Sequence, residues 1–144
     1  MSTAVDSTTG ASNCIDGINT YIMSCYWPCS KPYLCHTNTN KKPQEWLVIT
    51  VTGYSVDKIK VYNRVESDQD RINNAKLIYS YDFAGTSIVH QASFGTSASL
   101  VYTFDFSTTT YVRIQQTTSN VISLLEVAMY INNIKVPLSG EYSL

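Results

Sequence analysis

The stretch YNRVESDQDR, residues 62–71, concentrates charge in a chain that carries little of it. Its charged residues are Arg64, Glu66, Asp68, Asp70 and Arg71. An arginine side chain only donates hydrogen bonds, from a rigid fork, whereas the hydroxyl and ring oxygens of a neutral sugar accept them. The pattern is therefore compatible with a ligand site in which a carboxylate holds an arginine fork, or with a structural ion-pair cluster. The alternative is that these charges pair with one another and pin a solvated turn.

Catalytic chemistry finds little support in the sequence. It contains no P-loop, no HExxH, no GxSxG and no dinucleotide-binding fingerprint. His90 alternates within the run IVHQA, which is more typical of a structural residue in a strand than of a catalytic base. The sequence therefore favours a binding module over an enzyme.

The composition limits the classes of partner. The chain has 144 residues, the usual size of one domain, with 15% charged residues and a formal net charge of −1. It offers no basic footprint for nucleic acid and no apolar stretch long enough for a membrane span. Its polar surface must consist of hydroxyl and amide groups, which make the neutral hydrogen bonds that sugars use. We therefore expect glycans as partners.

All four cysteines, Cys14, Cys25, Cys29 and Cys35, fall within one short segment. An even, clustered set predicts two local disulfides, of which Cys25–Cys29 is the least expected because its loop is so short. The alternative is a zinc site built from Cys25, Cys29, Cys35 and His36, although no CxxC pair is present. Disulfides indicate an oxidising location. The N-terminus lacks the features of a signal peptide, so a non-standard export route and reduced thiols both stay open.

The pattern along the chain predicts an all-β fold. Residues 1–10 read as a loose arm, and residues 11–144 as a single domain that opens with long loops. From Trp46 onward, β-branched and aromatic runs alternate with turn-prone stretches, which is typical of an antiparallel sandwich or barrel. The expected strands are 45–51, 56–62, 75–81, 86–92, 99–106, 110–116 and 122–131. Residues that share one face of the run 99–106 should be buried: Leu100, Tyr102, Phe104 and Phe106.

Three stretches resemble the F-type lectins, within the discoidin (coagulation factor V/VIII C-domain) superfamily of galactose-binding-like jelly rolls. They are ASNCIDG, the run from Cys35 to Ser80, and TYVRIQQTTSNVISLLEVAMY, and they cover most of residues 11–131. The family's sugar motif runs His, then Arg-x-Asp, then Arg or Lys. The matching positions here are His36, Arg64, Glu66 and Arg71. The resemblance implies a jelly roll with a carbohydrate-binding site at these residues. Ser67 and Asp68 stand where many members have adjacent cysteines.

The resemblance also implies a structural calcium ion. The implied ligands are the backbone carbonyls of Asn13 and Ile18 and the carboxylates of Asp16 and Glu126. Glu126 stands inside an apolar strand, where a carboxylate needs a partner, and calcium would supply one. The alternative is that Glu126 faces solvent at a strand end or accepts from backbone N–H groups. The family's usual disulfide would need a cysteine at Leu125, so that bridge cannot form, and Cys35 pairs locally or stays free.

The sequence therefore predicts a single β-sandwich jelly roll that binds glycans, fucose-type sugars in particular, through one loop-rich end. The alternative from another class is a surface or capsid component that uses the same sandwich to contact copies of itself or other structural proteins. Both fit an extracellular or particle-surface location, and a virion component assembled in cytoplasm needs no signal peptide. Guanidinium groups of Arg64 and Arg71 that are partly exposed in a concavity would indicate the lectin. Guanidinium groups that are fully paired with carboxylates would indicate the structural module.

Overall fold

The computed structural model describes Cys14, residues 35–36, and residues 45–51, 56–65, 68–106 and 109–136. Strands make up most of the regular structure in these ranges. They are β1 (Cys35–His36), β2 (Trp46–Thr50), β3 (Lys58–Asn63), β4 (Lys76–Ser80), β5 (Ile88–Ser93), β6 (Val101–Asp105), β7 (Tyr111–Gln115), β8 (Ser123–Ile131) and β9 (Ile134–Val136). A short 3-10 helix, η2 (Gln69–Ile72), precedes β4. In the described part of the chain, no helix has the length and apolar character of a membrane span.

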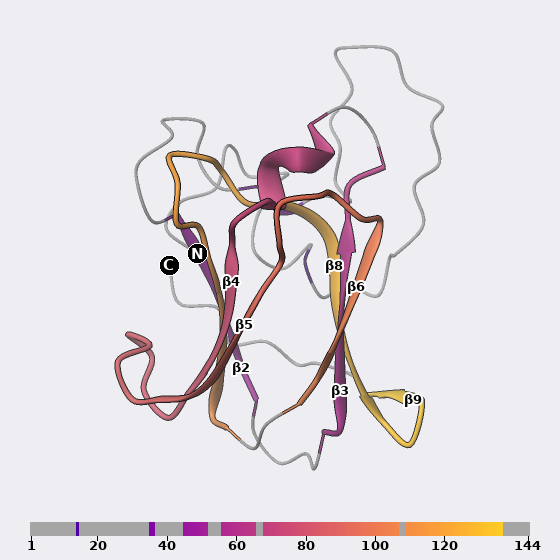
Figure 1. Cartoon of the computed structure of the whole chain (residues 1–144). Helices are drawn as coiled ribbons and strands as arrows, with labels where there is room; N and C mark the ends of the chain where they lie inside the picture. Colours follow the sequence, from indigo (N-terminus) through magenta and orange to yellow (C-terminus); the bar gives the residue numbers. More distant parts are fainter. Residues whose placement is uncertain are drawn as a thin grey trace.

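The strands form two sheets that face each other (Figure 1). One sheet has the order β1-β8-β3-β6, with β9 paired to β8, and the other has the order β2-β7-β4-β5. All the described strand pairings are antiparallel. Neighbours in each sheet are mostly distant in sequence, as in a jelly roll rather than a simple meander. The predicted all-β sandwich is therefore confirmed.

Alternation along β3 places one side of this strand in the core. In β3, Ile59 and Val61 are fully buried, whereas Lys58, Lys60 and Tyr62 between them are only partly covered. Other strands contribute aliphatic side chains that are likewise fully buried: Leu47, Leu77, Val112, Ile114, Leu124, Val127 and Met129. Both sheets thus supply the apolar layer between them, and its removal from water is the main favourable term in holding them together.

The face predicted for the run 99–106 is buried only in part. Three of its aromatic side chains pack against the core: Tyr102, Phe104 and Phe106. The ring of Phe94 meets those of Tyr102 and Phe104 edge-on, with centroids 4.9 and 5.1 Å apart. Leu100 is 52% exposed, because it precedes the first residue of β6, which is an edge strand. The prediction is therefore confirmed for the aromatic residues and wrong for Leu100.

His90 has the structural role that its position in a strand predicts. It lies in β5 and its ring stacks on that of Tyr79, with centroids 5.8 Å apart. The Tyr79 hydroxyl donates a hydrogen bond to the carbonyl oxygen of Asp105 at 2.8 Å. Burial, with a smaller contribution from the charge of Asp105, raises the pKa of Tyr79 well above its ordinary value, so this hydroxyl stays a donor.

The loop between β4 and β5, residues 81–87, covers part of the outer face of the four-stranded sheet. Phe83 packs edge-on against Trp46 and Tyr111, with ring centroids 5.6 and 5.9 Å away. The Arg113 guanidinium lies over the Trp46 ring, 4.5 Å from its centroid, and its Nη1 donates to the Phe83 carbonyl oxygen at 3.4 Å. Because the loop covers it, Arg113 is buried although it points away from the core.

Asp82 closes the same loop. Its carboxylate accepts a hydrogen bond from the backbone N–H of Thr86 at 3.1 Å and from the Thr86 hydroxyl at 2.8 Å. The other carboxylate oxygen accepts from the backbone N–H of Ser87. An aspartate that binds backbone N–H groups a few residues on is a standard way to hold a tight turn. The loop is therefore held from within as well as by its contact with Arg113.

Gly85 is the loop residue whose replacement should cost the most. It has φ +74°, and a Cβ there would lie 2.9 Å from Cδ of Arg113. We expect Gly85→Ala to lower the free energy of unfolding by about 2 kcal/mol, because backbone strain adds to the clash. Gly95→Ala is the matched control, since Gly95 has φ +79° but no atom within 4 Å of an added Cβ. It should cost about 1 kcal/mol. Equal losses in urea unfolding would contradict the contact with Arg113.

One of the predicted local disulfides is confirmed. Cys14 and Cys35 are bonded across a sequence separation of 21, and both are fully buried. Cys25 and Cys29 lie outside the described residues, so the second predicted disulfide stays a prediction. The zinc alternative is wrong, because it needs Cys35 as a ligand and this residue is in the disulfide.

Candidate carbohydrate-binding site

Arg64 and Arg71 meet at the carboxylate of Asp68. Arg71 Nη2 lies 3.0 Å from Asp68 Oδ2, and Arg64 Nη1 lies 4.0 Å from the same oxygen. The side chain of Arg71 is 25% exposed, that of Arg64 is 9% exposed, and that of Asp68 is 46% exposed. The two guanidinium groups that the sequence predicted to converge are therefore close together, one at the surface and one beneath it.

Asn63, the last residue of β3, shapes the turn that carries these residues. Its Nδ2 donates to the carbonyl oxygens of Gln69 at 2.9 Å and Ser99 at 3.1 Å. Its Oδ1 accepts from the backbone N–H of Arg64 at 2.9 Å. Asp68, just before η2, adopts a left-handed conformation with φ 65°, which asparagine and aspartate tolerate better than most residues. The buried amide of Asn63 thus fixes the start of the turn.

The loop after β7 holds the other end of this turn. The buried Gln116 side chain donates from Nε2 to the carbonyl oxygen of Arg71. Its Oε1 accepts a hydrogen bond from the Thr118 hydroxyl at 3.2 Å. The Thr117 hydroxyl donates to the Asn74 carbonyl oxygen at 2.7 Å. The turn with η2 is therefore anchored at one end of the sandwich, above the ends of the two sheets in Figure 1.

The strand position of His36 lies across β8 from Arg64. In β1, His36 pairs with Ser123 of β8. The Ser123 hydroxyl accepts a hydrogen bond from Arg64 Nη1 at 3.3 Å. Residues directly opposite in an antiparallel pair have Cα atoms about 4.5–5.5 Å apart. One intermediate residue, Ser123, therefore links the backbone of His36 to the arginine pair.

The structure thus brings together part of the predicted site. Arg64 and Arg71 converge, and the backbone of His36 lies across β8 from Arg64, with Ser123 between them. Glu66 and the side chain of His36 lie outside the described residues, so their contacts stay predictions. The carboxylate that both arginines approach is that of Asp68, which the sequence offered as a partner for them only in the solvated-turn alternative.

Sequence reasoning missed two residues that contact the arginine-bearing turn, Ser123 at the start of β8 and Gln116 in the loop after β7. Ser123 is 59 residues from Arg64, and Gln116 is 45 residues from Arg71. Both are polar residues near the ends of apolar strands. That position predicts that they lie at one end of the sandwich, but it does not predict which residues they contact. No local pattern could have assigned them to these arginines.

Glu126 is almost completely buried in the middle of β8 and has a cationic partner. Lys135 Nζ, from β9, donates to Glu126 Oε1 at 3.0 Å. The hydroxyls of Tyr62 and Tyr130 lie 3.1 Å apart. Burial, this hydrogen bond, and the charges of Tyr62 and Glu126 raise the pKa of Tyr130 to about 12. The expectation that Glu126 needs a partner is confirmed, and an ammonium group supplies one that the sequence did not suggest.

The calcium hypothesis stays a prediction. Three of the implied ligand residues, Asn13, Asp16 and Ile18, lie outside the described residues. Among the residues that the structure does describe, no group of three or more His, Cys, Asp or Glu side chains could hold a metal ion. Lys135 already contacts one oxygen of Glu126, so a calcium ion here would have to use the other oxygen or displace the lysine.

Comparison with known proteins gives matches among solved structures, whereas no protein-family model and no curated protein matches the sequence. The lectin domain of lectinolysin complexed with Lewis B antigen has a TM-score of 0.67 and 21% identity, covering 88% of this chain and 87% of that chain. The Streptococcus pneumoniae fucose-binding module SpX-3 has a TM-score of 0.64 and 20% identity, covering 89% of each chain. The F-lectin (fucolectin) from striped bass (Morone saxatilis) serum has a TM-score of 0.60 and 22% identity, covering 89% of this chain and 44% of that chain.

Identities of this size establish a shared fold. The predicted resemblance to the F-type lectins and the discoidin superfamily is confirmed at that level. The chain therefore has the galactose-binding-like β-sandwich fold of these carbohydrate-binding proteins.

Proposed function

We propose that this chain is a carbohydrate-binding module that attaches to glycans through the loop-rich end of the sandwich. The observation that carries this is that Arg64 and Arg71 lie close together at this end of the sandwich and that the Arg71 side chain is 25% exposed, although both arginines approach the Asp68 carboxylate, as the structural module also expects. Carbohydrate-binding proteins of the same fold, including two fucose-binding ones, support the class of ligand. A non-catalytic role agrees with the absence of catalytic motifs from the sequence.

The different exposure of the two arginines suggests a different role for each. Arg71 is the one whose side chain reaches the surface, so we assign it the direct hydrogen bonds to sugar hydroxyls. Arg64 is buried beneath it and touches Ser123 and Asp68, so we assign it a positioning role. His36 and Glu66 would complete the site as the family motif implies, His36 as a further hydrogen-bonding group and Glu66 as a second brace.

We propose a fucose-type sugar as the ligand. The lectinolysin domain that shares the fold was solved with Lewis B antigen, and the pneumococcal module is a fucose-binding one. Motif positions of the F-type lectins are occupied here by Arg64 and Arg71, which are donors only and so suit a cluster of hydroxyl and ring oxygens.

A glycan array tests the proposal directly. The wild-type protein should bind fucose-bearing glycans such as Lewis B and ignore the same glycans without fucose. Heat-denatured protein on the same array controls for non-specific adhesion. Equal binding to glycans without fucose would support the carbohydrate-binding proposal and reject fucose as the preferred sugar. No binding to any glycan would remove both.

The structural-module alternative is favoured by a separate observation. In the described part of the chain, β5 and β6 each end a sheet, and both carry exposed apolar residues. These residues are Ile88, Val89 and Val101. Open edges of this kind can pair with other chains. Light scattering across a range of concentrations tests this, since the lectin proposal expects no concentration-dependent assembly, whereas large assemblies without glycan binding would favour the structural module.

We further propose that a calcium ion binds Asp16 and Glu126, as the resemblance implies. A ligand that binds only the native state stabilises it by mass action. Because Lys135 already neutralises Glu126, we expect a modest effect: excess chelator should lower the free energy of unfolding by about 1 kcal/mol. In Lys135→Met the carboxylate loses its ammonium partner, so the effect of chelator should grow. Identical melting curves with and without chelator, in both proteins, would end the calcium proposal.

A further inference from the structure

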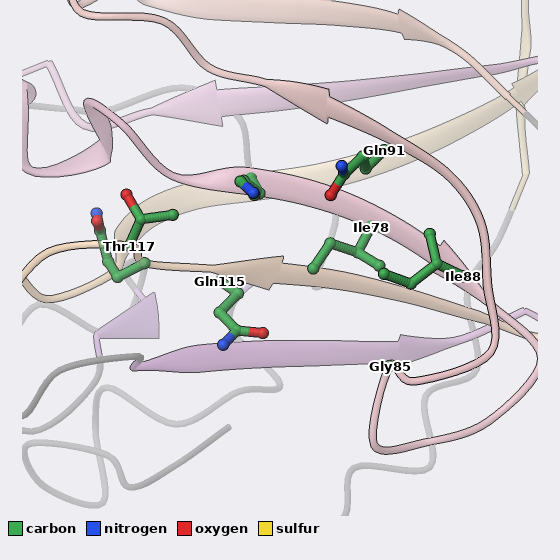
Figure 2. A pocket seen from close by; sticks show the side chains of 8 residues that line it. Ile78, Gly85, Ile88, Gln91, Gln115 and Thr117 are labelled. Carbon is green, nitrogen blue, oxygen red and sulfur yellow. The ribbon is translucent and has the colours of Figure 1, made fainter.

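A hollow lies on the outer face of the sheet β2-β7-β4-β5. We call it the outer-face groove, and its main lining residues are Lys76, Ile78, Ile88, Gln91, Gln115 and Thr117. Its volume is about 370 Å³, within the range of small-molecule sites. A smaller hollow of about 210 Å³ adjoins it and shares Lys76 and Gln91. Figure 2 shows the amides of Gln91 and Gln115 on either side of Ile78 and Ile88.

The strand register places these side chains next to one another. In β4, Lys76 and Ile78 alternate with core residues and so point to the outer face. Ile78 pairs with Gln91 of β5, and Lys76 pairs with Gln115 of β7. Side chains directly opposite on one face of a sheet are near neighbours. Three adjacent strands therefore build the groove, and rigid elements of this kind hold polar groups in fixed positions.

The polar groups of the groove present mainly donors. Gln115 Oε1 accepts from Arg113 Nε at 2.8 Å, which leaves the Gln115 amide N–H groups to face a ligand. Within the described part of the chain, neither Lys76 nor Gln91 makes a side-chain hydrogen bond or ion pair. Among the described residues of the lining, Lys76 is the charged one, and no carboxylate accompanies it there. The groove thus suits a negatively charged ligand that is rich in acceptor oxygens.

The base of the groove is apolar. Ile78 is nearly buried and Ile88 is half exposed, and together they present aliphatic surface between the two glutamines. A ligand that combines acceptor oxygens with an apolar C–H face matches this combination of floor and walls. We propose that the outer-face groove is a second binding site, for a sugar unit that carries a carboxylate. It uses neither arginine of the candidate site, although Gln116 and Thr117, which hold the arginine-bearing turn, also line the groove. Binding at the groove and glycan binding at the arginines can therefore be tested separately.

Nuclear magnetic resonance titration tests this site, because the side-chain NH2 signals of Gln91 and Gln115 report on it directly. Galacturonate is the probe, galactose is the control for the ring without the charge, and acetate is the control for the charge without the ring. We expect galacturonate to shift both glutamine signals and the methyl signals of Ile88, with galactose and acetate each giving markedly smaller shifts at the same concentration. Unchanged glutamine signals at tens of millimolar galacturonate would overturn the proposal.

Two variants separate this site from the arginine site. Lys76→Gln keeps a polar side chain on an exposed position and should weaken galacturonate binding by at least about threefold, because it removes the positive charge that the described lining presents to the ligand. Arg71→Ala should leave the galacturonate shifts at Gln91 and Gln115 unchanged. If Lys76→Gln binds galacturonate as the wild type does, or if Arg71→Ala abolishes the shifts, the groove is not the site. If acetate alone reproduces the shifts, the groove binds carboxylates and not sugars.

Discussion

Replacing Arg71 by alanine should weaken glycan binding by about 1.5–3 kcal/mol, roughly ten- to a hundredfold, because it removes charge-assisted donors to a bound hydroxyl. The fold should barely change. The Arg71–Asp68 ion pair is partly exposed on both sides, and such a pair is worth only about 0–1 kcal/mol. Glycan affinity and urea unfolding, measured on the same protein, check both parts of this expectation.

Lys58→Ala is the matched control, because Lys58 begins β3 at the opposite end of the strand from the arginine turn. It should change neither affinity nor stability appreciably. The opposite pattern for Arg71→Ala would be a loss of about 3–5 kcal/mol in stability, as expected when a buried charge loses its partner, with no glycan bound by the wild type. That outcome would reject the lectin and leave the structural module.

Removing the Cys14–Cys35 disulfide should lower the free energy of unfolding by about 3 kcal/mol. The bond closes a loop with a sequence separation of 21, and closing a loop of this length restricts the unfolded chain by about that amount. The bond also holds β1, a strand of only two residues that carries His36. We therefore expect the double variant Cys14→Ser, Cys35→Ser to bind glycans more weakly as well as to unfold at lower urea concentration.

Reduction of the wild-type protein provides the comparison for this variant. Reductant should bring the stability of the wild type close to that of the double variant, and it should change the double variant itself very little. If reductant destabilises the double variant by a similar amount, a bond between Cys25 and Cys29 contributes the stability instead. If it changes neither protein, the disulfide is not what holds this segment.

The fold was predictable from the sequence because local patterns of apolar and polar residues mark its strands. The alternation of Ile59 and Val61 with polar neighbours, and the apolar run of β8, each define a strand and its buried side. The departure at Leu100 arises where a strand begins, since alternation describes residues within a strand and not the exact point where pairing starts. The sequence did not predict which strands lie next to each other in each sheet, because that order depends on pairing between distant residues.

The candidate site was predictable only where its residues are close in sequence. The pairing of Arg64 and Arg71 follows from their crowding in one turn, but three acids crowd there with them, and spacing alone does not choose Asp68. The Lys135 partner of Glu126 depends on the tight turn at Asn132 and Asn133, which returns the chain alongside β8. Likewise, the outer-face groove gathers residues from separate strands, and a linear pattern contains no sign of that.

The hydrogen bonds inside the loop 81–87 have a consequence for how the protein behaves in acid. They lower the pKa of Asp82 from 3.8 to about 2, the backbone N–H groups of Ser87 and Thr86 being the main cause. A carboxyl group with a lowered pKa stabilises the folded state fully above its unfolded pKa and loses that effect as the pH falls through the lowered value. Between neutral pH and about pH 4, Asp82 therefore stays charged, so the hydrogen bonds that close the loop 81–87, whose Gly85 also lines the outer-face groove, keep their acceptor in acidified surroundings.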